Sequence, residues 1–452
     1  MSKNPRMMSR VVTVLSCVML AGGAVGLASC ETVRGVQKDL DLSPKQELTA
    51  PVAAITYKTE PEIRVRVAKG ATKKTVSGPA KVVVRQMGTT GKSNVLKTPL
   101  TITSGSAGIL VVDGSGGKNQ WPTGADVEVL ASEGDPLAPA VGAQPLTLEG
   151  GKVPGFLSIK GQWADGGGHF DVIATMPIES YLPGVVTHEL LPKWPRQTNE
   201  AQAVAARTYA LHERARARSE NRVVDVENTT VDQVYGAFVT PVAADAVRAT
   251  RGMVLVSDGK LMRAYFSSQC GGRPASAADV WPDYPFNRAR ALQGQPRQAY
   301  CQKSSLYRWE VTRKDDDVNR RIRAWGRTTR HEVETFGRVR SIEVLEANDA
   351  ERPNKYKLID DKGNEYTLKA EELRMSLNHP ASGLPPITKE NRIHSGDLEA
   401  EVWANQVRFT GRGWGHGVGM CQWCAKGMAD QGMDWSSMVR TFYPGVEIVK
   451  AY

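Results

Sequence analysis

Residues 181–194 read YLPGVVTHELLPKW and residues 200–211 read EAQAVAARTYAL, and these two runs decide the fold class. The first predicts a short helix over Tyr181 to Leu190, capped by Ser180, with Pro183 tolerated in its first turn and Pro192 ending it. The second lies in a predicted longer helix, Asn199 to about Ser219, whose apolar residues recur at helical spacing. Two adjacent helices of this kind form the centre of the predicted fold.

The sequence on both sides of these helices is strand-like. Residues 63–67 alternate strictly between apolar and basic side chains, and residues 60–175 as a whole predict a β-rich half with glycine-rich turns. We expect an α+β fold with a sheet-rich body and a few helices. Beyond the central helices, the later predicted elements are strands at 252–256 and 262–267, an irregular stretch to Trp309, strands with a 361–364 turn over 338–368, a glycine-rich motif at 411–419, and a last helix near Trp435 to Phe442.

The composition is that of a folded protein with a basic balance. The chain has 452 residues, of which 41% are hydrophobic and 23% charged, enough for one elaborate domain or two smaller ones. A mean hydropathy of −0.35 argues against a multi-span membrane protein. The net charge of +10 suits an anionic partner, whether nucleic acid, lipid or an acidic glycan.

The N-terminus has the layout of an export signal. Basic residues precede the apolar run Val11 to Leu20, which is short for a membrane-spanning helix. The run ends in Leu27-Ala28-Ser29-Cys30, which resembles a bacterial lipobox. We expect residues 1–29 to be a lipoprotein signal, Cys30 to be lipidated, and residues 30–54 to be a polar tether. An ordinary signal with a chance cysteine is the alternative.

This N-terminus also predicts where the protein acts. Export places the chain in the cell envelope and excludes nucleic acid as a partner. Glu31, rather than aspartate, follows Cys30, which favours an outer membrane anchor facing the periplasm.

Four cysteines remain after processing: Cys270, Cys301, Cys421 and Cys424. The cell envelope permits disulfides, so these four are disulfide candidates with a structural role, and a tie between Cys270 and Cys301 would hold down an irregular loop. A tetrahedral zinc site made of four thiolates and a set of free thiols are the alternatives. We otherwise expect no cofactor.

Glu189 is the leading candidate for chemistry. It lies near the end of its predicted helix among apolar residues, and both burial and the helix dipole raise the pKa of a carboxyl there. A protonated carboxyl near neutral pH suits the general acid of glycosidic cleavage. An exposed helical glutamate is the alternative. Glu179 lies about 15 Å away along the helix, so the two acids are not paired.

Three runs, YLPGVVTHELLPKW…EAQAVAARTYAL, CGGRPASAADVW and GRGWGHGVGMCQW, together resemble the SpoIID/LytB family of bacterial cell-wall proteins. The resemblance covers most of residues 60–452 and implies one such domain over residues 55–452, with its catalytic helices within 176–220 and a glycan-binding cleft. It implies a lytic transglycosylase that cleaves peptidoglycan glycan strands, preferring those stripped of peptides. The family's catalytic glutamate falls on Glu189.

The resemblance also suggests residues that bind substrate. They are Arg207, Gln202, His416, Gln422 and Ser268. Structural roles are the alternatives for Arg207, Gln202 and His416. Two departures stand out: the family's tyrosine after Gln422 is a tryptophan here, and the histidine that many relatives carry before the paired glycines is missing, which removes one candidate metal ligand.

Glycan binding without catalysis is the rival function. The resemblance also allows a non-catalytic role, in which the protein binds glycan and enhances the activity of a partner cell-wall amidase. The predicted partners are therefore peptidoglycan glycan strands, an amidase and, through the lipid anchor, a membrane.

Overall fold

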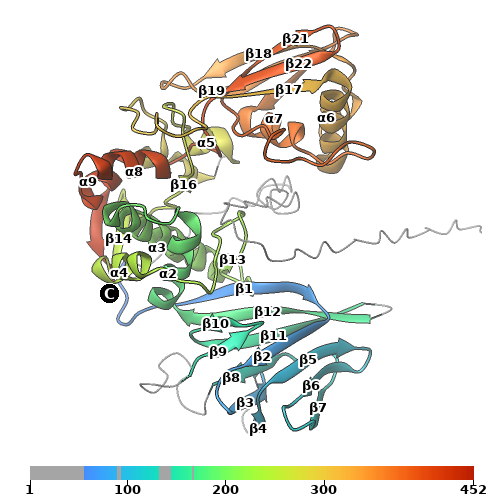
Figure 1. The fold of residues 1–452 in the computed structure, drawn as a ribbon, viewed down its shortest axis with the longest axis vertical. Coiled ribbons are helices and arrows are strands. Elements are labelled where there is room, and N and C mark those ends of the chain that lie inside the picture. Colours follow the sequence, from blue (N-terminus) through green and yellow to red (C-terminus); the bar gives the residue numbers. More distant parts are fainter. Residues whose placement is uncertain (1–54, 89–92, 132–143, 165–166, 283) are drawn as a thin grey trace, which may run out of the picture. The chain divides into compact units, whose positions relative to one another are not determined.

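The computed structural model describes residues 55–88, 93–131, 144–164, 167–282 and 284–452, in which helices and sheets combine in an α+β fold, as predicted (Figure 1). The predicted signal over 1–29, Cys30 and the tether over 30–54 lie outside the described residues. Within the described ranges, no helix combines the length and the apolar character needed to cross a bilayer.

The β-rich half is built on two sheets in which nearly all neighbouring strands are antiparallel. Ile63 and Val65 of β1 are fully buried, whereas Arg64 and Arg66 are only half-buried and make ion pairs, which confirms the predicted alternation. The larger sheet has the order β13(Val226–Glu227)-β1(Glu62–Ala71)-β12(Gly167–Pro177)-β11(Phe156–Ala164)-β8(Val127–Leu130)-β3(Lys81–Gln86)-β4(Ser93–Lys97), in which β13 pairs with β1 in parallel. The second has the order β10(Gly151–Val153)-β9(Leu146–Leu148)-β2(Lys73–Ser77)-β5(Leu100–Gly105)-β6(Gly108–Val112)-β7(Lys118–Trp121).

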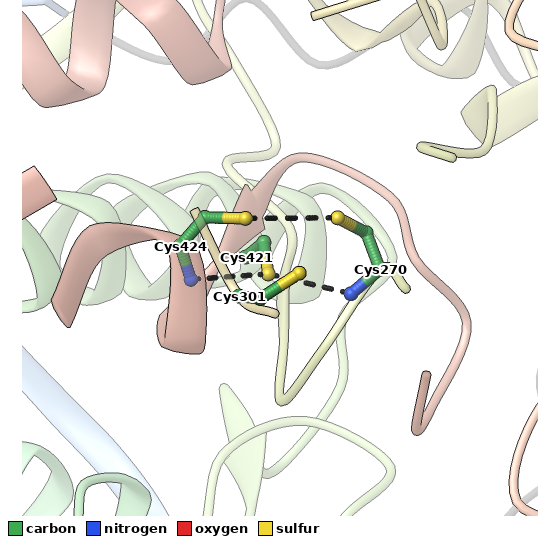
Figure 2. Close-up of side chains that lie close together, drawn as sticks. All are labelled: Cys270, Cys301, Cys421 and Cys424. Atoms are coloured by element: carbon green, nitrogen blue, oxygen red, sulfur yellow. Dashed lines mark hydrogen bonds between the residues drawn. The ribbon is translucent and has the colours of Figure 1, made fainter. Parts of the chain in front are cut away.

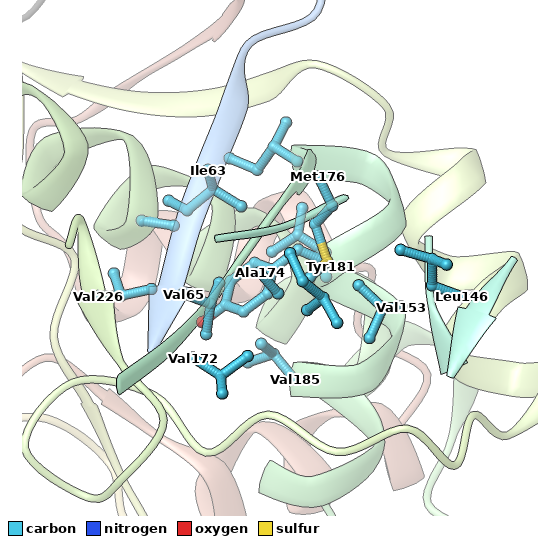
Figure 3. Close-up of a cluster of buried hydrophobic side chains, with 14 of the residues drawn as sticks. Ile63, Val65, Leu146, Val153, Val172, Ala174, Met176, Tyr181, Val185 and Val226 are labelled. Atoms are coloured by element: carbon cyan, nitrogen blue, oxygen red, sulfur yellow. The ribbon is translucent and has the colours of Figure 1, made fainter. Parts of the chain in front are cut away.

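The two central helices follow this half directly. Strand β12 ends at Pro177, and α2 (Ile178–Glu189) begins at the next residue, so Pro177 rather than Ser180 is the N-cap residue and the predicted cap is wrong. Figure 3 shows Val172 and Ala174 of β12 in one buried cluster with Tyr181 and Val185 of α2. The helix is therefore packed against the strand that leads into it.

Helix α3 (Arg196–Ser219) is the longest described helix and is buried over most of its length. It begins three residues before the predicted start, after Pro195, whose fixed φ suits a helix entrance. It packs against α2, α4 (Pro241–Ala249), α8 (Gln422–Asp430) and α9 (Trp435–Phe442). The last helix matches its predicted bounds, whereas α4 and α8 were not predicted.

The rest of the chain forms two further cores. One surrounds α8 and α9 and includes all four described cysteines; the other lies between α6 (Asp315–Thr329), α7 (Ala370–Leu377) and two small sheets.

The predicted turn at 361–364 joins β19 to β20. The small sheets are β15(Lys260–Leu261)-β14(Met253–Ser257)-β24(Glu447–Lys450), β16(Phe266–Ser267)-β23(Met420–Cys421), β17(Trp309–Lys314)-β22(Gln406–Gly411)-β21(Leu398–Trp403) and β18(Val339–Ala347)-β19(Pro353–Asp360)-β20(Glu365–Lys369). The stretch expected to be irregular holds α5 (Ala277–Val280) and the 3₁₀ turns η1 (Pro285–Arg288) and η2 (Arg290–Leu292), and a further 3₁₀ turn, η3 (Glu332–Thr335), follows α6.

The glycine-rich motif packs against the protein's own backbone. Gly413 and Gly419 have φ of 75° and 70°, a region that favours glycine. A Cβ at Gly413 would lie 2.4 Å from the carbonyl oxygen of Gln269, and one at Gly419 would lie 2.0 Å from that of Tyr265. These glycines thus allow close contact with residues 265–271.

Candidate active site

Glu189 is the last residue of α2, where the chain turns into extended backbone at Leu190. Its side chain is half-buried. Oε1 accepts a hydrogen bond from the backbone N–H of Val234 at 3.2 Å, and Oε2 accepts one from Nε2 of Gln422 at 3.4 Å. Burial raises the pKa of Glu189 from 4.5 to about 7, and the two hydrogen bonds oppose that rise. The carboxyl can therefore hold or release a proton near neutral pH.

Gln422 links Glu189 to a second predicted residue. It is the first residue of α8, and its Nε2 also donates to Oε1 of Gln202 on α3 at 3.2 Å. Gln202 is fully buried, and its own Nε2 has no hydrogen-bond partner among the described residues. The structure thus brings Glu189, Gln422 and Gln202 together from three different helices.

Ser268, just after β16, and two tryptophans lie beside the first turn of α8, which carries Gln422. The backbone N–H of Trp423 donates to the carbonyl of Ser268 at 3.1 Å, so the half-buried Ser268 lies next to the first turn of α8. Trp423 meets Trp194 edge to face, with ring centroids 5.2 Å apart. Trp423, which stands where the family resemblance predicts a tyrosine, therefore makes a packing contact that needs no hydroxyl.

Arg207 occupies a different environment from the one predicted. Its side chain is fully buried, and its Nε and Nη2 donate to the two carboxylate oxygens of Glu179 at 2.7 and 2.9 Å. Its remaining donors reach the carbonyls of Val247 and Met253. Glu179 also accepts from the hydroxyl of Tyr452. With its donors used inside the protein, the contacts of Arg207 are those of the structural alternative.

His416 is held by main-chain groups. Its Nε2 lies 3.0 Å from the carbonyl oxygen of Phe266, and its Nδ1 accepts from the N–H of Val418 at 3.0 Å. The ring also packs at a tilt on Trp281, with centroids 4.7 Å apart. These contacts are those of the structural alternative for His416.

Cys270, Cys301, Cys421 and Cys424 are all buried and lie together, although three separate parts of the chain supply them. None of these described cysteines is joined in a disulfide. The sulfurs of Cys270 and Cys424 are 3.8 Å apart, well beyond the length of about 2.05 Å of a disulfide bond. The predicted tie between Cys270 and Cys301 is absent from the structure, in which every sulfur of the group faces the others.

Sequence reasoning missed the segment that covers Glu189 from the other side. Val234 acts through its backbone N–H, which leaves no side-chain signature. The neighbouring Tyr235 stacks on Tyr181 of α2, with centroids 5.3 Å apart. Tyr181 itself was assigned only to the helix, yet its hydroxyl donates to Oε1 of Gln233 at 3.3 Å. The aromatic pair holds residues 233–235 against α2, through a tyrosine of its first turn.

The chain thus combines an α+β fold with a half-buried acid at a helix end, which contacts one buried glutamine that in turn contacts a second. A family model described as stage II sporulation protein matches residues 166–256, and a domain of unknown function matches residues 286–419. An uncharacterized protein of Brachyspira hyodysenteriae is 30% identical over 281 residues, which are 62% of this chain and 68% of that protein.

Two relatives from Bacillus subtilis carry functional names. Its amidase enhancer is 25% identical over 291 residues, which are 59% of this chain and 40% of the enhancer. Its stage II sporulation protein D is 24% identical over 310 residues, which are 62% of this chain and 76% of that protein. The chain belongs to the SpoIID/LytB family, which confirms the resemblance found in its sequence.

Proposed function

We propose that this protein is a peptidoglycan lytic transglycosylase in which Glu189 is the single acid and base. One observation carries the proposal: Glu189 is half-buried at the end of α2 with a pKa of about 7, so a large share of the carboxyl is protonated at neutral pH. General acids that protonate a glycosidic oxygen need a pKa raised in this way.

The proposed reaction uses the same carboxyl twice. Glu189 donates its proton to the glycosidic oxygen as the bond to the muramoyl sugar breaks through an oxocarbenium-like state. The carboxylate then takes the proton of the C6 hydroxyl of that sugar, and the hydroxyl oxygen closes a 1,6-anhydro ring. No water is consumed, and Glu189 ends the cycle protonated.

A single carboxyl is consistent with the surroundings of Glu189. Hydrolytic glycosidases in most families use two carboxyl groups at a defined separation. Glu179, the other acid of α2, is bound to Arg207 and Tyr452 and is therefore not available as a partner. Among the described residues, the groups that shift the Glu189 pKa besides burial are Val234 and Gln422, and neither is an acid.

Gln422 and Gln202 are proposed to assist in binding substrate. Amide groups can donate to and accept from sugar hydroxyls. The Nε2 of Gln202, which has no partner among the described residues, provides a donor beside Gln422. Ser268 remains a candidate because of its place beside Trp423.

The cellular setting is also proposed. The lipobox-like run before Cys30 supports a lipoprotein exported to the cell envelope and anchored in the outer membrane facing the periplasm. The net charge of +10 suits an acidic glycan. The similarity to an amidase enhancer supports a cell-wall amidase as a partner.

The products of the purified exported protein test the proposal. Glycan strands stripped of peptides are incubated with the protein and analysed by mass spectrometry. We expect products with 1,6-anhydro-muramoyl ends, each lighter by one water than a hydrolytic product. Glu189→Gln should lower the rate about 10²–10⁴-fold and keep glycan affinity within a few-fold. Glu220→Gln, at the end of α3, is the matched control and should be as active as the wild type.

Two results would reject the proposal. Glycan affinity with no cleavage would identify a binding protein, and stimulation of an amidase by the same preparation would assign the enhancer function. Cleavage that persists in the Glu189→Gln variant would remove Glu189 from the mechanism.

A further inference from the structure

Four buried thiols lie together at the first turn of α8. Cys270 follows β16, Cys301 lies in the stretch before β17, and Cys421 and Cys424 flank the start of α8. The four sulfur atoms all lie within 4.8 Å of one another. Figure 2 shows the four side chains converging on one point from opposite sides. Three segments that are far apart in the sequence therefore meet at this group.

The spacing of the sulfurs fits a tetrahedral metal site. Four ligands at the usual zinc–sulfur distance of about 2.3 Å place each pair of sulfurs about 3.8 Å apart. Cys270 Sγ and Cys424 Sγ are 3.8 Å apart. Two disulfides would instead require two pairs at about 2.05 Å, with the pairs free to move away from each other. The observed gathering of all four sulfurs is what a shared metal requires.

The groups around the sulfurs suit thiolates. The backbone N–H groups of Cys270 and Cys424 both donate to Sγ of Cys421 at 3.3 Å. Cys421 is also the N-cap residue of α8, where the helix dipole favours negative charge. The guanidinium of Arg297 acts electrostatically on the Cys270 sulfur, and Arg352 donates to the carbonyl of Cys270. These donors and cations would balance the charge of a tetrathiolate site.

We propose that Cys270, Cys301, Cys421 and Cys424 bind one Zn²⁺ ion through four thiolate sulfurs. Binding releases four protons, one from each thiol, and the completed site carries a net charge of −2. With four protein ligands the coordination is closed, as in structural zinc sites. The ion therefore joins three segments of the fold and leaves no position for a water or a substrate.

The site also bears on Glu189, and this step rests on the proposed function. Gln422 and Trp423 are the two residues between Cys421 and Cys424. Gln422 donates to Glu189 and to Gln202, and Trp423 packs on Trp194. A metal that holds both flanking cysteines fixes the helical turn from which these two side chains project. The zinc ligands are in this sense positioning residues for Gln422.

Metal analysis of the full exported chain tests the site directly. Protein purified without chelator and dialysed is expected to hold one zinc per chain by mass spectrometry of the metal. Replacement of the zinc by Co²⁺ should give the strong thiolate-to-metal absorption of a four-sulfur site. Cys301→Ser is expected to lower zinc content at least ten-fold. Met420→Leu, a volume-conserving change at a buried residue beside Cys421, is the control and should keep the full metal content.

The alternatives give different results. Peptide mapping without reductant that finds the four cysteines joined in disulfides would overturn the proposal. So would four reduced thiols that take up neither Zn²⁺ nor Co²⁺ in the folded protein. If Cys301→Ser fails to fold, the Co²⁺ spectrum of the wild-type chain still decides the ligand set.

The positioning step has its own measurement. Removal of the metal from the folded protein should change the pH profile of glycan cleavage in the same direction as loss of the Gln422 amide. An unchanged profile in metal-free, folded protein would reject the positioning step alone. Metal content does not depend on glycan cleavage, so the failure of the zinc site and the failure of the proposed function are separate outcomes.

Discussion

The side-chain amide of Gln422 donates to the carboxylate of Glu189 at 3.4 Å, although the two residues are 233 positions apart. Helix α8 brings Gln422 to the end of α2, where the same amide also donates to Gln202. This contact stabilises the charged form of an acid whose burial favours the neutral form. The balance of the two effects sets the pH at which Glu189 changes charge.

Gln422→Leu should move that balance toward the neutral acid. A hydrogen bond to a charged group is worth about 1.5–3 kcal/mol, and one pKa unit corresponds to about 1.36 kcal/mol. We expect the variant to raise the pKa of Glu189 by about one unit, so the alkaline limb of the cleavage rate moves upward by that amount. Gln431→Leu, at the other end of α8 and exposed, should leave the profile in place. Identical profiles for both variants would mean that Gln422 does not act on Glu189.

The protonation of Glu189 should also appear in the stability of the fold. The folded protein holds this proton up to about pH 7, whereas an unfolded chain releases it near pH 4.5. The folded state therefore binds the proton more tightly and loses stability as pH rises from about 4.5 to about 7. Glu189→Gln removes this contribution and should be more stable than the wild type at pH 8 by about 2 kcal/mol, less than the full shift implies because the side chain is partly exposed.

Urea unfolding of both proteins at pH 4 and pH 8 measures the difference. The gain in the variant should be present at pH 8 and absent at pH 4. A gain of equal size at both values would point to packing rather than ionisation.

Elements with a strong local pattern were predictable from the sequence. The alternation around Ile63 and Val65 identified β1, and the last helix, predicted near Trp435 to Phe442, matches the bounds of α9. Helix α6 was missed although the three aspartates of its first turn, Asp315 to Asp317, are a helix-start signal. The N-cap of α2 was misplaced because Ser180 suits a cap, whereas the end of β12 sets where the helix begins.

The site was predictable only in part, because its contacts join distant segments. Glu189 was found from its helix end and from the family resemblance. The pairing of Arg207 with Glu179 depends on α2 starting at Ile178, which puts Glu179 in the first turn. No local pattern reveals that two cysteine segments fold onto the start of α8. Such contacts follow from the tertiary fold and not from residue spacing.

The proposed lipid anchor makes a prediction for the N-terminus. Cys30→Ala removes the thiol to which lipid would be attached. We expect the variant to lose incorporation of labelled fatty acid and to remain unprocessed or mislocalised in cell fractions. Cys17→Ala, within the proposed signal, is the control and should be labelled like the wild type. Normal processing of the Cys30 variant with label retained would reject the lipoprotein assignment.

Arg207 and Glu179 should behave as a structural ion pair. Both side chains are almost fully buried, and removing one partner of such a pair leaves an uncompensated charge in the core, at a cost of about 3–5 kcal/mol. Arg207→Met should lower the free energy of unfolding by that amount. The double variant Glu179→Gln with Arg207→Met should recover part of the loss, because no buried charge then remains. Arg248→Met, at an exposed position of α4, is the control and should change stability by less than about 0.5 kcal/mol.

The same variants distinguish this role from substrate binding. Arg207→Lys keeps a positive charge but loses the two-pronged contact with Glu179, so it should also lower stability. Its glycan affinity, measured at a temperature where the variant is fully folded, should match that of the wild type, since the guanidinium donates to Glu179 and to backbone carbonyls rather than to solvent. A large loss of glycan affinity with stability unchanged would restore Arg207 to the substrate site.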